Sequence, residues 1–103
     1  MAISDVTFRN GWYTTLDSNN KKIDEKSEGS IGQLLGFSSE LMVFKRNGWY
    51  AVYDEKFKKI DEKSEGAIGT FRNVVGLNLN FLKNRWITTY DKNFKKISER
   101  ADR

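Results

Sequence analysis

Apolar and polar residues alternate in short runs along most of this chain, and the runs are separated by turns rich in asparagine, aspartate and glycine. Alternation over roughly four to eight residues is typical of a half-buried β-strand, because successive side chains point to opposite faces of a sheet. The clearest such runs are Trp49–Asp54 and Lys58–Lys63. The one helical candidate, Asp61–Gly66, is short and polar. The pattern therefore predicts an all-β fold without helices.

Asparagine–glycine pairs mark the tightest predicted turns. Asn10-Gly11 and Asn47-Gly48 lie between runs rich in aromatic and β-branched residues, and Asn84-Arg85 is a weaker form of the same signal. Both central residues of a type I′ hairpin turn need positive φ, which Asn and Gly tolerate best. A two-residue turn also fixes which residues face each other across the hairpin. The expected partners are Arg9 with Trp12, Arg46 with Trp49, Lys83 with Trp86, Phe44 with Ala51, Met42 with Tyr53, Lys45 with Tyr50 and Val43 with Val52.

The alternating pattern repeats at a spacing of 37 residues. The tryptophans fall at Trp12, Trp49 and Trp86, and the stretch KKIDEKSEG occurs at both Lys21–Gly29 and Lys58–Gly66. Self-similarity at a fixed period is the mark of a repeat architecture. We therefore predict one domain built from three tandem 37-residue β-meander units, of which the third is truncated. The domain spans residues 1–103, with units at about 7–43, 44–80 and 81–103.

The second turn of each unit begins with an aspartate, at Asp17, Asp54 and Asp91. An aspartate in this position accepts hydrogen bonds from the backbone of its own turn, which is sufficient reason for its recurrence. Between units, the glycine-containing segment Ile68–Gly76 is a candidate for a short fourth strand.

The exposed edges of such meanders must be covered, because unpaired strand edges promote association with other chains. We predict a small closed barrel-like or pseudo-threefold domain, with completion by a second copy of the chain as the alternative. In length and aromatic content the units resemble blades of β-propellers. The NGW signature is loosely similar to the tryptophan-glycine repeats of bacterial proteins, in which Trp and Gly stand in the reverse order. The blade resemblance implies an analogy with small lectins that assemble a propeller from two-blade chains and bind sugar at tryptophans.

The composition argues against an enzyme. The chain has neither cysteine nor histidine, so the commonest general base and the commonest transition-metal ligands are missing. No phosphate-binding loop, dinucleotide fingerprint or nucleophile elbow is present. Asp24, Glu25 and Glu28 lie close in sequence, but lysines are interleaved with them and the spacing of a calcium loop is absent. We expect no catalytic activity, no cofactor and no metal site.

Charge and hydropathy restrict the partners. The formal net charge is +4 and the sequence pI is about 9.4, with positive charge accumulating towards the C-terminal unit. Single-stranded nucleic acid is therefore a candidate ligand, although the mixed charges of KKIDEKSEG would repel phosphates over much of the surface. No apolar run is long enough to cross a membrane, and the N-terminus does not resemble a signal peptide. We expect a cytoplasmic protein without membrane contact, and a secreted chain whose signal peptide had been removed is the alternative.

The cation beside each tryptophan has two interpretations. The tryptophan can be a ligand platform with the cation as its polar partner, or it can be a core residue covered by the cation's aliphatic stem. Trp49, Ala51 and Tyr53 alternate as a buried face would, which favours the core interpretation. Five further apolar residues are expected in the core or at its rim: Ile23, Phe57, Ile60, Phe94 and Ile97.

The leading functional hypothesis is a non-enzymatic binding module for a protein partner or for a second copy of the chain. The second is a carbohydrate-binding module, and the third is a single-stranded nucleic-acid binder that uses the basic third unit. The candidate ligand-binding residues are Trp12, Trp49, Trp86, Arg9, Arg46 and Lys83.

Overall fold

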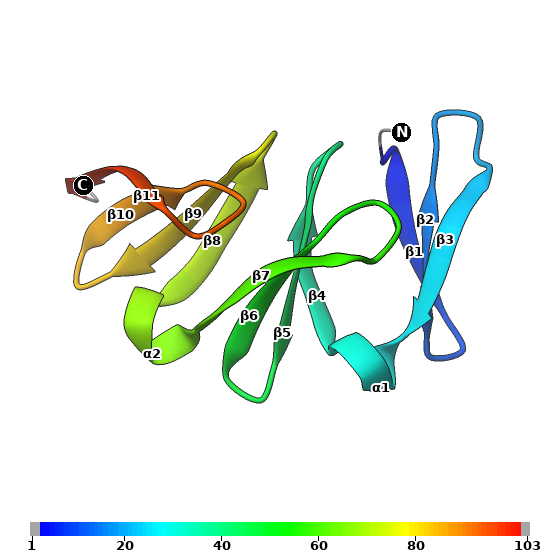
Figure 1. The fold of residues 1–103 in the computed structure, drawn as a ribbon, viewed down its shortest axis with the longest axis horizontal. Helices are drawn as coiled ribbons and strands as arrows, with labels where there is room; N and C mark the ends of the chain where they lie inside the picture. Colours follow the sequence, from blue (N-terminus) through cyan, green and yellow to red (C-terminus); the bar gives the residue numbers. More distant parts are fainter. Residues whose placement is uncertain (1–2, 102–103) are drawn as a thin grey trace.

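The computed structural model describes residues 3–101, and the chain forms three separate antiparallel sheets over this range (Figure 1). The predicted all-β class is therefore correct. The outermost two residues at each end, which belong to the predicted N-terminus and third unit, lie outside the described residues.

Sheet A contains β1 (Asp5–Arg9), β2 (Trp12–Leu16) and β3 (Lys22–Ser27). Sheet B contains β4 (Gln33–Phe37), β5 (Met42–Arg46), β6 (Trp49–Tyr53) and β7 (Lys59–Ser64). Sheet C contains β8 (Thr70–Val75), β9 (Asn78–Lys83), β10 (Trp86–Tyr90) and β11 (Lys96–Ala101).

The sheets lie side by side along the long axis of the molecule, with sheet B in the middle (Figure 1). No closed barrel forms among the described strands, so that part of the prediction is wrong. The predicted fourth strand does exist as β8, but it joins the sheet that follows it in the chain. Sheets B and C thus have four strands each, whereas sheet A begins at β1 and has three.

The hairpin turns follow from their sequences. Asn47 and Gly48 have φ values of 52° and 80°, as a type I′ turn requires, and Asn84 and Arg85 adopt the same conformation at 52° and 69°. The turns fix the register, and all the predicted cross-strand pairs are present, including Arg46 with Trp49.

The recurrent aspartates form one hydrogen-bonded turn in each sheet. A carboxylate oxygen of Asp54 accepts hydrogen bonds from the backbone N–H groups of Lys56 and Lys58, both at 2.9 Å. Asp17 and Asp91 make the corresponding bonds in sheets A and C. The predicted role of these aspartates is confirmed.

Two four-residue helices, α1 (Glu28–Ile31) and α2 (Glu65–Ile68), link one sheet to the next, contrary to the prediction of no helix. Each helix ends at a glycine with φ near 90°, at Gly32 and Gly69. A Cβ on Gly69 would lie 2.3 Å from the carbonyl oxygen of Leu82, so only glycine allows the linker to approach sheet C so closely.

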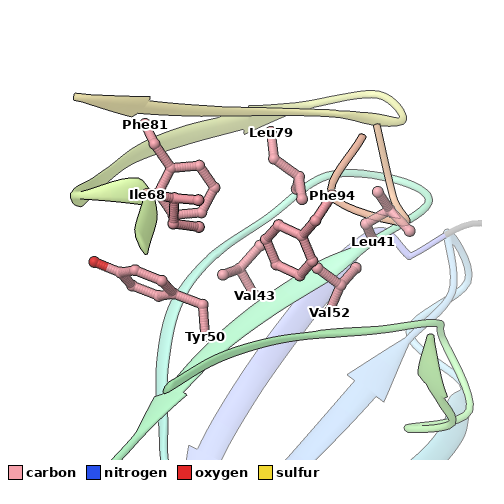
Figure 2. Close-up of a cluster of buried hydrophobic side chains, with 8 residues drawn as sticks. All are labelled: Leu41, Val43, Tyr50, Val52, Ile68, Leu79, Phe81 and Phe94. Carbon is pink, nitrogen blue, oxygen red and sulfur yellow. The ribbon is translucent and has the colours of Figure 1, made fainter. Parts of the chain in front are cut away.

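The core consists of two layers, one on each face of sheet B. Between sheets B and C lie the side chains shown in Figure 2, where Phe81 and Leu79 of β9 face Tyr50, Val43 and Val52 of sheet B. The layer between sheets A and B contains Ile3, Tyr13, Ile31, Met42, Phe44 and Phe57.

The expected rim residues do not all behave alike. Phe57 and Phe94 are buried as predicted, and Ile60 packs at the edge of the layer between sheets B and C. Ile23 is partly buried. Ile97 is 55% exposed, so its assignment to the core or rim is wrong. Its counterpart Ile60 packs against that layer, whereas Ile97 belongs to sheet C at the end of the molecule, where no further described sheet follows.

Buried tyrosines join neighbouring sheets through hydrogen bonds. The Tyr50 hydroxyl donates to the carbonyl of Gly69 at 2.8 Å and accepts from the N–H of Phe71 at 3.1 Å. The Tyr13 hydroxyl accepts a bond from the N–H of Leu34 at 3.1 Å in the same way. These bonds hold the first strand of each following sheet in place, and Tyr50 also holds the linker before it, which sets the width of the space between sheets.

Candidate functional site

The three tryptophans are half-exposed. Trp12, Trp49 and Trp86 are 48%, 49% and 48% accessible, so the interpretation of these residues as core is wrong. The buried face of β6 is the opposite one, which carries Tyr50 and Val52. Period-two alternation shows that a strand has two faces but does not say which of them is covered, and both faces of β6 carry large side chains.

Trp49 lines a hollow of 260 Å³ on the face of sheet B that looks towards sheet A. This Trp49 groove has a floor formed by β6, where Trp49, Ala51 and Tyr53 follow one another on one face of the strand. Ala51 is the smallest of the three and leaves the space between the two rings. The remaining lining residues are Ser30, Ile31, Arg46, Asn47, Lys59 and Glu62.

Trp86 lines a second hollow, of 330 Å³, on sheet C. This Trp86 groove is lined by residues that lie 37 positions after lining residues of the Trp49 groove. In both grooves a basic residue and an asparagine stand at the hairpin, and the floor runs from tryptophan through a small residue to tyrosine. The lining residues are Lys83, Asn84, Trp86, Thr88, Tyr90, Lys96 and Glu99.

The basic residue beside each tryptophan holds the preceding helix. Arg46 donates a hydrogen bond from Nη1 to the carbonyl of Ser30 in α1 at 3.2 Å. Lys83 donates from Nζ to the carbonyls of Gly66 and Ala67 in α2, both at 3.2 Å. A cation is favourable there because the last carbonyls of a helix lack partners within it. Arg46 and Lys83, which were predicted to bind a ligand, therefore have a structural role as well.

A lysine–glutamate ion pair forms one wall of each groove. Lys59 is the cross-strand partner of Tyr53, and Glu62 is the partner of Ala51, so β7 places both charges beside the floor. The Lys59 ammonium binds the Glu62 carboxylate, and Lys96 binds Glu99 at 3.2 Å in the Trp86 groove. All four side chains are about half-exposed, so these pairs add little to stability and stay accessible to a ligand.

The tyrosines of the grooves remain neutral phenols. Burial raises the pKa of Tyr53 and of Tyr90 above the ordinary value for tyrosine. The hydrogen bond to Glu62 raises the pKa of the Lys59 ammonium, which therefore keeps its charge. At neutral pH the Trp49 groove thus contains the Lys59–Glu62 ion pair, the Arg46 guanidinium and an uncharged phenol.

Trp12 stands in a different setting on the outer face of sheet A. On this face of β2, Trp12 is followed by Thr14 and Leu16, so a leucine stands where the Trp49 and Trp86 grooves have a tyrosine. The pair Lys22–Glu25 is present at 3.1 Å. The predicted partner Arg9 is exposed and is cross-strand to Trp12. Of the predicted ligand residues, the structure places Trp49 with Arg46, and Trp86 with Lys83, in separate grooves.

Sequence reasoning missed the tyrosines and the ion pairs. The signal was available, because Tyr53 and Tyr90, Lys59 and Lys96, and Glu62 and Glu99 are each 37 residues apart. What could not be seen was the register between β6 and β7, which contains a bulge between Val52 and Tyr53. That bulge decides which residues of β7 lie beside the floor.

Other kinds of site find little support. Within residues 3–101, no group of three or more acidic side chains is arranged to hold a metal ion. Over the same range, no helix has the length and hydropathy needed to cross a bilayer. Compared with protein-family models, curated proteins and solved structures, the chain gives no significant match. The function must therefore be argued from the grooves themselves.

Proposed function

We propose that the chain is a non-enzymatic binding module that takes its ligand in the Trp49 and Trp86 grooves. The observation that carries this proposal is the half-exposure of both indoles inside hollows with corresponding linings. An exposed tryptophan does not gain the free energy that burial of its apolar surface would give. Tryptophan is also enriched among the residues that contribute most to binding. Two such sites with the same polar wall support a common ligand.

We further propose that the three sheets are copies of one 37-residue unit. The support lies in the matched groove linings, the matched aspartate turns and the two tyrosine bonds between sheets. Under this proposal both grooves derive from the same unit and bind the same class of ligand.

The alternative is that a second copy of the chain packs on an outer sheet of the stack. The outer face of sheet A argues against this alternative. Asp5 and Thr7 stand there at the positions that Met42 and Phe44 occupy in sheet B. Both are exposed. An aspartate in this position would have to be desolvated if another sheet packed on it.

The outer face of sheet C also carries polar residues at positions that are apolar in sheet B. Asn80 and Thr89 take the positions of Val43 and Val52, and Thr89 donates a hydrogen bond to Asn80 at 2.6 Å. Asn80 in turn donates to Asn73 at 2.8 Å. These polar outer faces resemble the caps of a finite stack, so we favour a ligand other than a second copy of the sheets.

Tryptophan fluorescence tests the proposal. The chain is titrated with a panel of neutral oligosaccharides, acidic oligosaccharides, single-stranded DNA and proline-rich peptides. We expect one class to change the emission, and Trp49→Ala or Trp86→Ala to weaken that binding by about tenfold. Trp12→Ala is the matched control and should bind as the parent does.

Two outcomes would contradict the proposal. The first is a panel in which no class alters the emission. The second is a ligand whose affinity is the same for the parent, Trp49→Ala and Trp86→Ala. Light scattering on the same samples checks self-association, and a mass that rises with protein concentration in the absence of ligand would favour the second-copy alternative.

A further inference from the structure

The polar wall of each groove offers a donor and an acceptor side by side. A lysine ammonium only donates hydrogen bonds, and an ionised carboxylate only accepts them. In the Trp49 groove Lys59 and Glu62 stand together beside the floor, and Lys96 and Glu99 do so in the Trp86 groove. A ligand that satisfies both members needs groups that accept and donate at neighbouring positions, as adjacent hydroxyl groups do.

The charge of the grooves argues against phosphate-bearing ligands. Arg46 and Lys83 keep their charge but are hydrogen-bonded to helix carbonyls, and the second cation of each groove is paired with a carboxylate, so each groove has one cation without a carboxylate partner. A phosphate approaching Lys59 meets the charge of Glu62 as well. Nucleic-acid affinity normally depends on several unpaired cations that neutralise phosphates, which these walls do not provide.

The floor suits a ligand with an apolar face. The indole of Trp49 and the ring of Tyr53 lie on one face of β6, four residues apart, with Ala51 between them. At about 3.3 Å per residue the two rings are roughly 13 Å apart along the strand, so the ligand is elongated. A pyranose ring has such an apolar C–H face together with hydroxyl groups at its rim.

We propose that the two grooves bind a neutral oligosaccharide, with sugar rings on the tryptophan and tyrosine and adjacent hydroxyls held by the lysine–glutamate pair. This inference rests on the proposed function of the grooves and adds the ligand class and the residues that select it. Because the same constellation occurs twice in one chain, a repeating polysaccharide offers the same sugar units to both grooves.

The test follows the three indole N–H signals by NMR in ¹⁵N-labelled protein, assigned with Trp12→Phe, Trp49→Phe and Trp86→Phe. The probes are neutral hexasaccharides of glucose, mannose, xylose and N-acetylglucosamine, a hexagalacturonate, and a dodecamer of thymidylate. We expect a neutral hexasaccharide to shift the Trp49 and Trp86 signals and to leave Trp12 nearly unchanged. Its affinity should hardly depend on salt concentration.

Variants of the polar wall test its role in selection. Lys59→Met with Lys96→Met, and Glu62→Gln with Glu99→Gln, should each weaken binding of the neutral hexasaccharide by about 10- to 100-fold, as lost charge-assisted hydrogen bonds imply. Lys22→Met with Glu25→Gln is the matched control on sheet A and should change nothing. Circular dichroism of each variant checks that the fold is intact.

The outcomes separate the two proposals. If thymidylate or hexagalacturonate shifts Trp49 and Trp86 and no neutral hexasaccharide does, the sugar inference is overturned while the proposed function stands. If a neutral hexasaccharide binds equally well to the wall variants, selection by the ion pair is overturned. A panel in which no probe shifts any indole overturns the sugar inference, and it overturns the proposed function as well if the proline-rich peptides of the fluorescence panel also fail to bind.

Discussion

The phenol of Tyr50 shows how single residues set the spacing between the sheets. Its hydroxyl is hydrogen-bonded to both the linker and the first strand of sheet C, while its ring lies in the core with its centroid 4.9 Å from that of Phe81. At the corresponding position sheet C has Ile87. The tyrosine is thus present where a neighbouring sheet has to be held, and isoleucine takes its place on the face of sheet C against which no described sheet packs.

Tyr50→Phe should therefore loosen the contact between sheets B and C. The substitution keeps the ring but leaves the carbonyl of Gly69 and the N–H of Phe71 without this partner. We expect the free energy of unfolding to fall by about 1–3 kcal/mol, measured by urea denaturation. Tyr13→Phe removes the hydrogen bond from the N–H of Leu34 and should cost less. Equal stability of Tyr50→Phe and the parent would show that the phenol does not join the sheets.

The helical linkers are the elements on which the sequence was least informative. Hairpins could be predicted because Asn47 and Gly48 meet a strict backbone requirement. A four-residue helix such as α2 is too short to show a helical period, so its pattern merges with that of the strand before it. The position of Gly69 is understandable only once its contact with sheet C is known.

Gly69→Ala should disrupt the linker. The added Cβ would lie 2.3 Å from the Leu82 oxygen, and the glycine has a φ of +92°. We expect a loss of at least about 2 kcal/mol in the free energy of unfolding. Gly66→Ala, in α2 itself, is the control, because nothing lies within 4 Å of its added Cβ. Similar stability losses in both variants would mean that the close approach is not what restricts position 69.

At the scale of the element, the alternation of apolar and polar residues also could not show which face of β6 is covered. Sheet B is packed on both sides, so Phe44 and Val43 of neighbouring β5 are both buried although they point in opposite directions. The register could be predicted from the turn, but the exposure of Trp49 could not. It depends on how far sheet A reaches over the face of sheet B, which only the packing of whole sheets determines.

Across the whole molecule, buried phenols connect stability to alkaline pH. Burial raises the pKa of Tyr50, Tyr53 and Tyr90 above the ordinary value. The unfolded chain then loses these protons at lower pH than the folded one. The contribution to stability is complete below the ordinary pKa, about 10, and disappears as the pH rises through the folded-state pKa values.

We therefore expect the free energy of unfolding to decline above about pH 10. Urea denaturation at a series of pH values measures the slope, and Tyr53→Phe removes one of the phenols concerned. The decline should be shallower in this variant than in the parent. An identical or steeper decline would contradict the role of Tyr53 in this pH dependence.

The arrangement of three sheets leaves polar residues on the outer faces of the stack and leaves the Trp49 and Trp86 grooves accessible. The order of the strands and most of their pairings could be derived from residue spacing, whereas the open stack could not, because the spacing is equally compatible with a barrel. Polar residues such as Asp5 and Asn80, at positions that are apolar in sheet B, were the available signal. They could be interpreted only after the faces of each sheet had been assigned.

The central claim is that Trp49 and Trp86 are accessible in the free protein and become covered by ligand. Fluorine NMR of protein labelled with 5-fluorotryptophan tests this most directly, since each of the three tryptophans gives one signal. We predict that all three signals shift between H₂O and D₂O in the free protein, and that a bound ligand abolishes this solvent shift for Trp49 and Trp86 but not for Trp12. Solvent-insensitive signals from Trp49 and Trp86 in the free protein, or unchanged solvent shifts in the bound state, would contradict the claim.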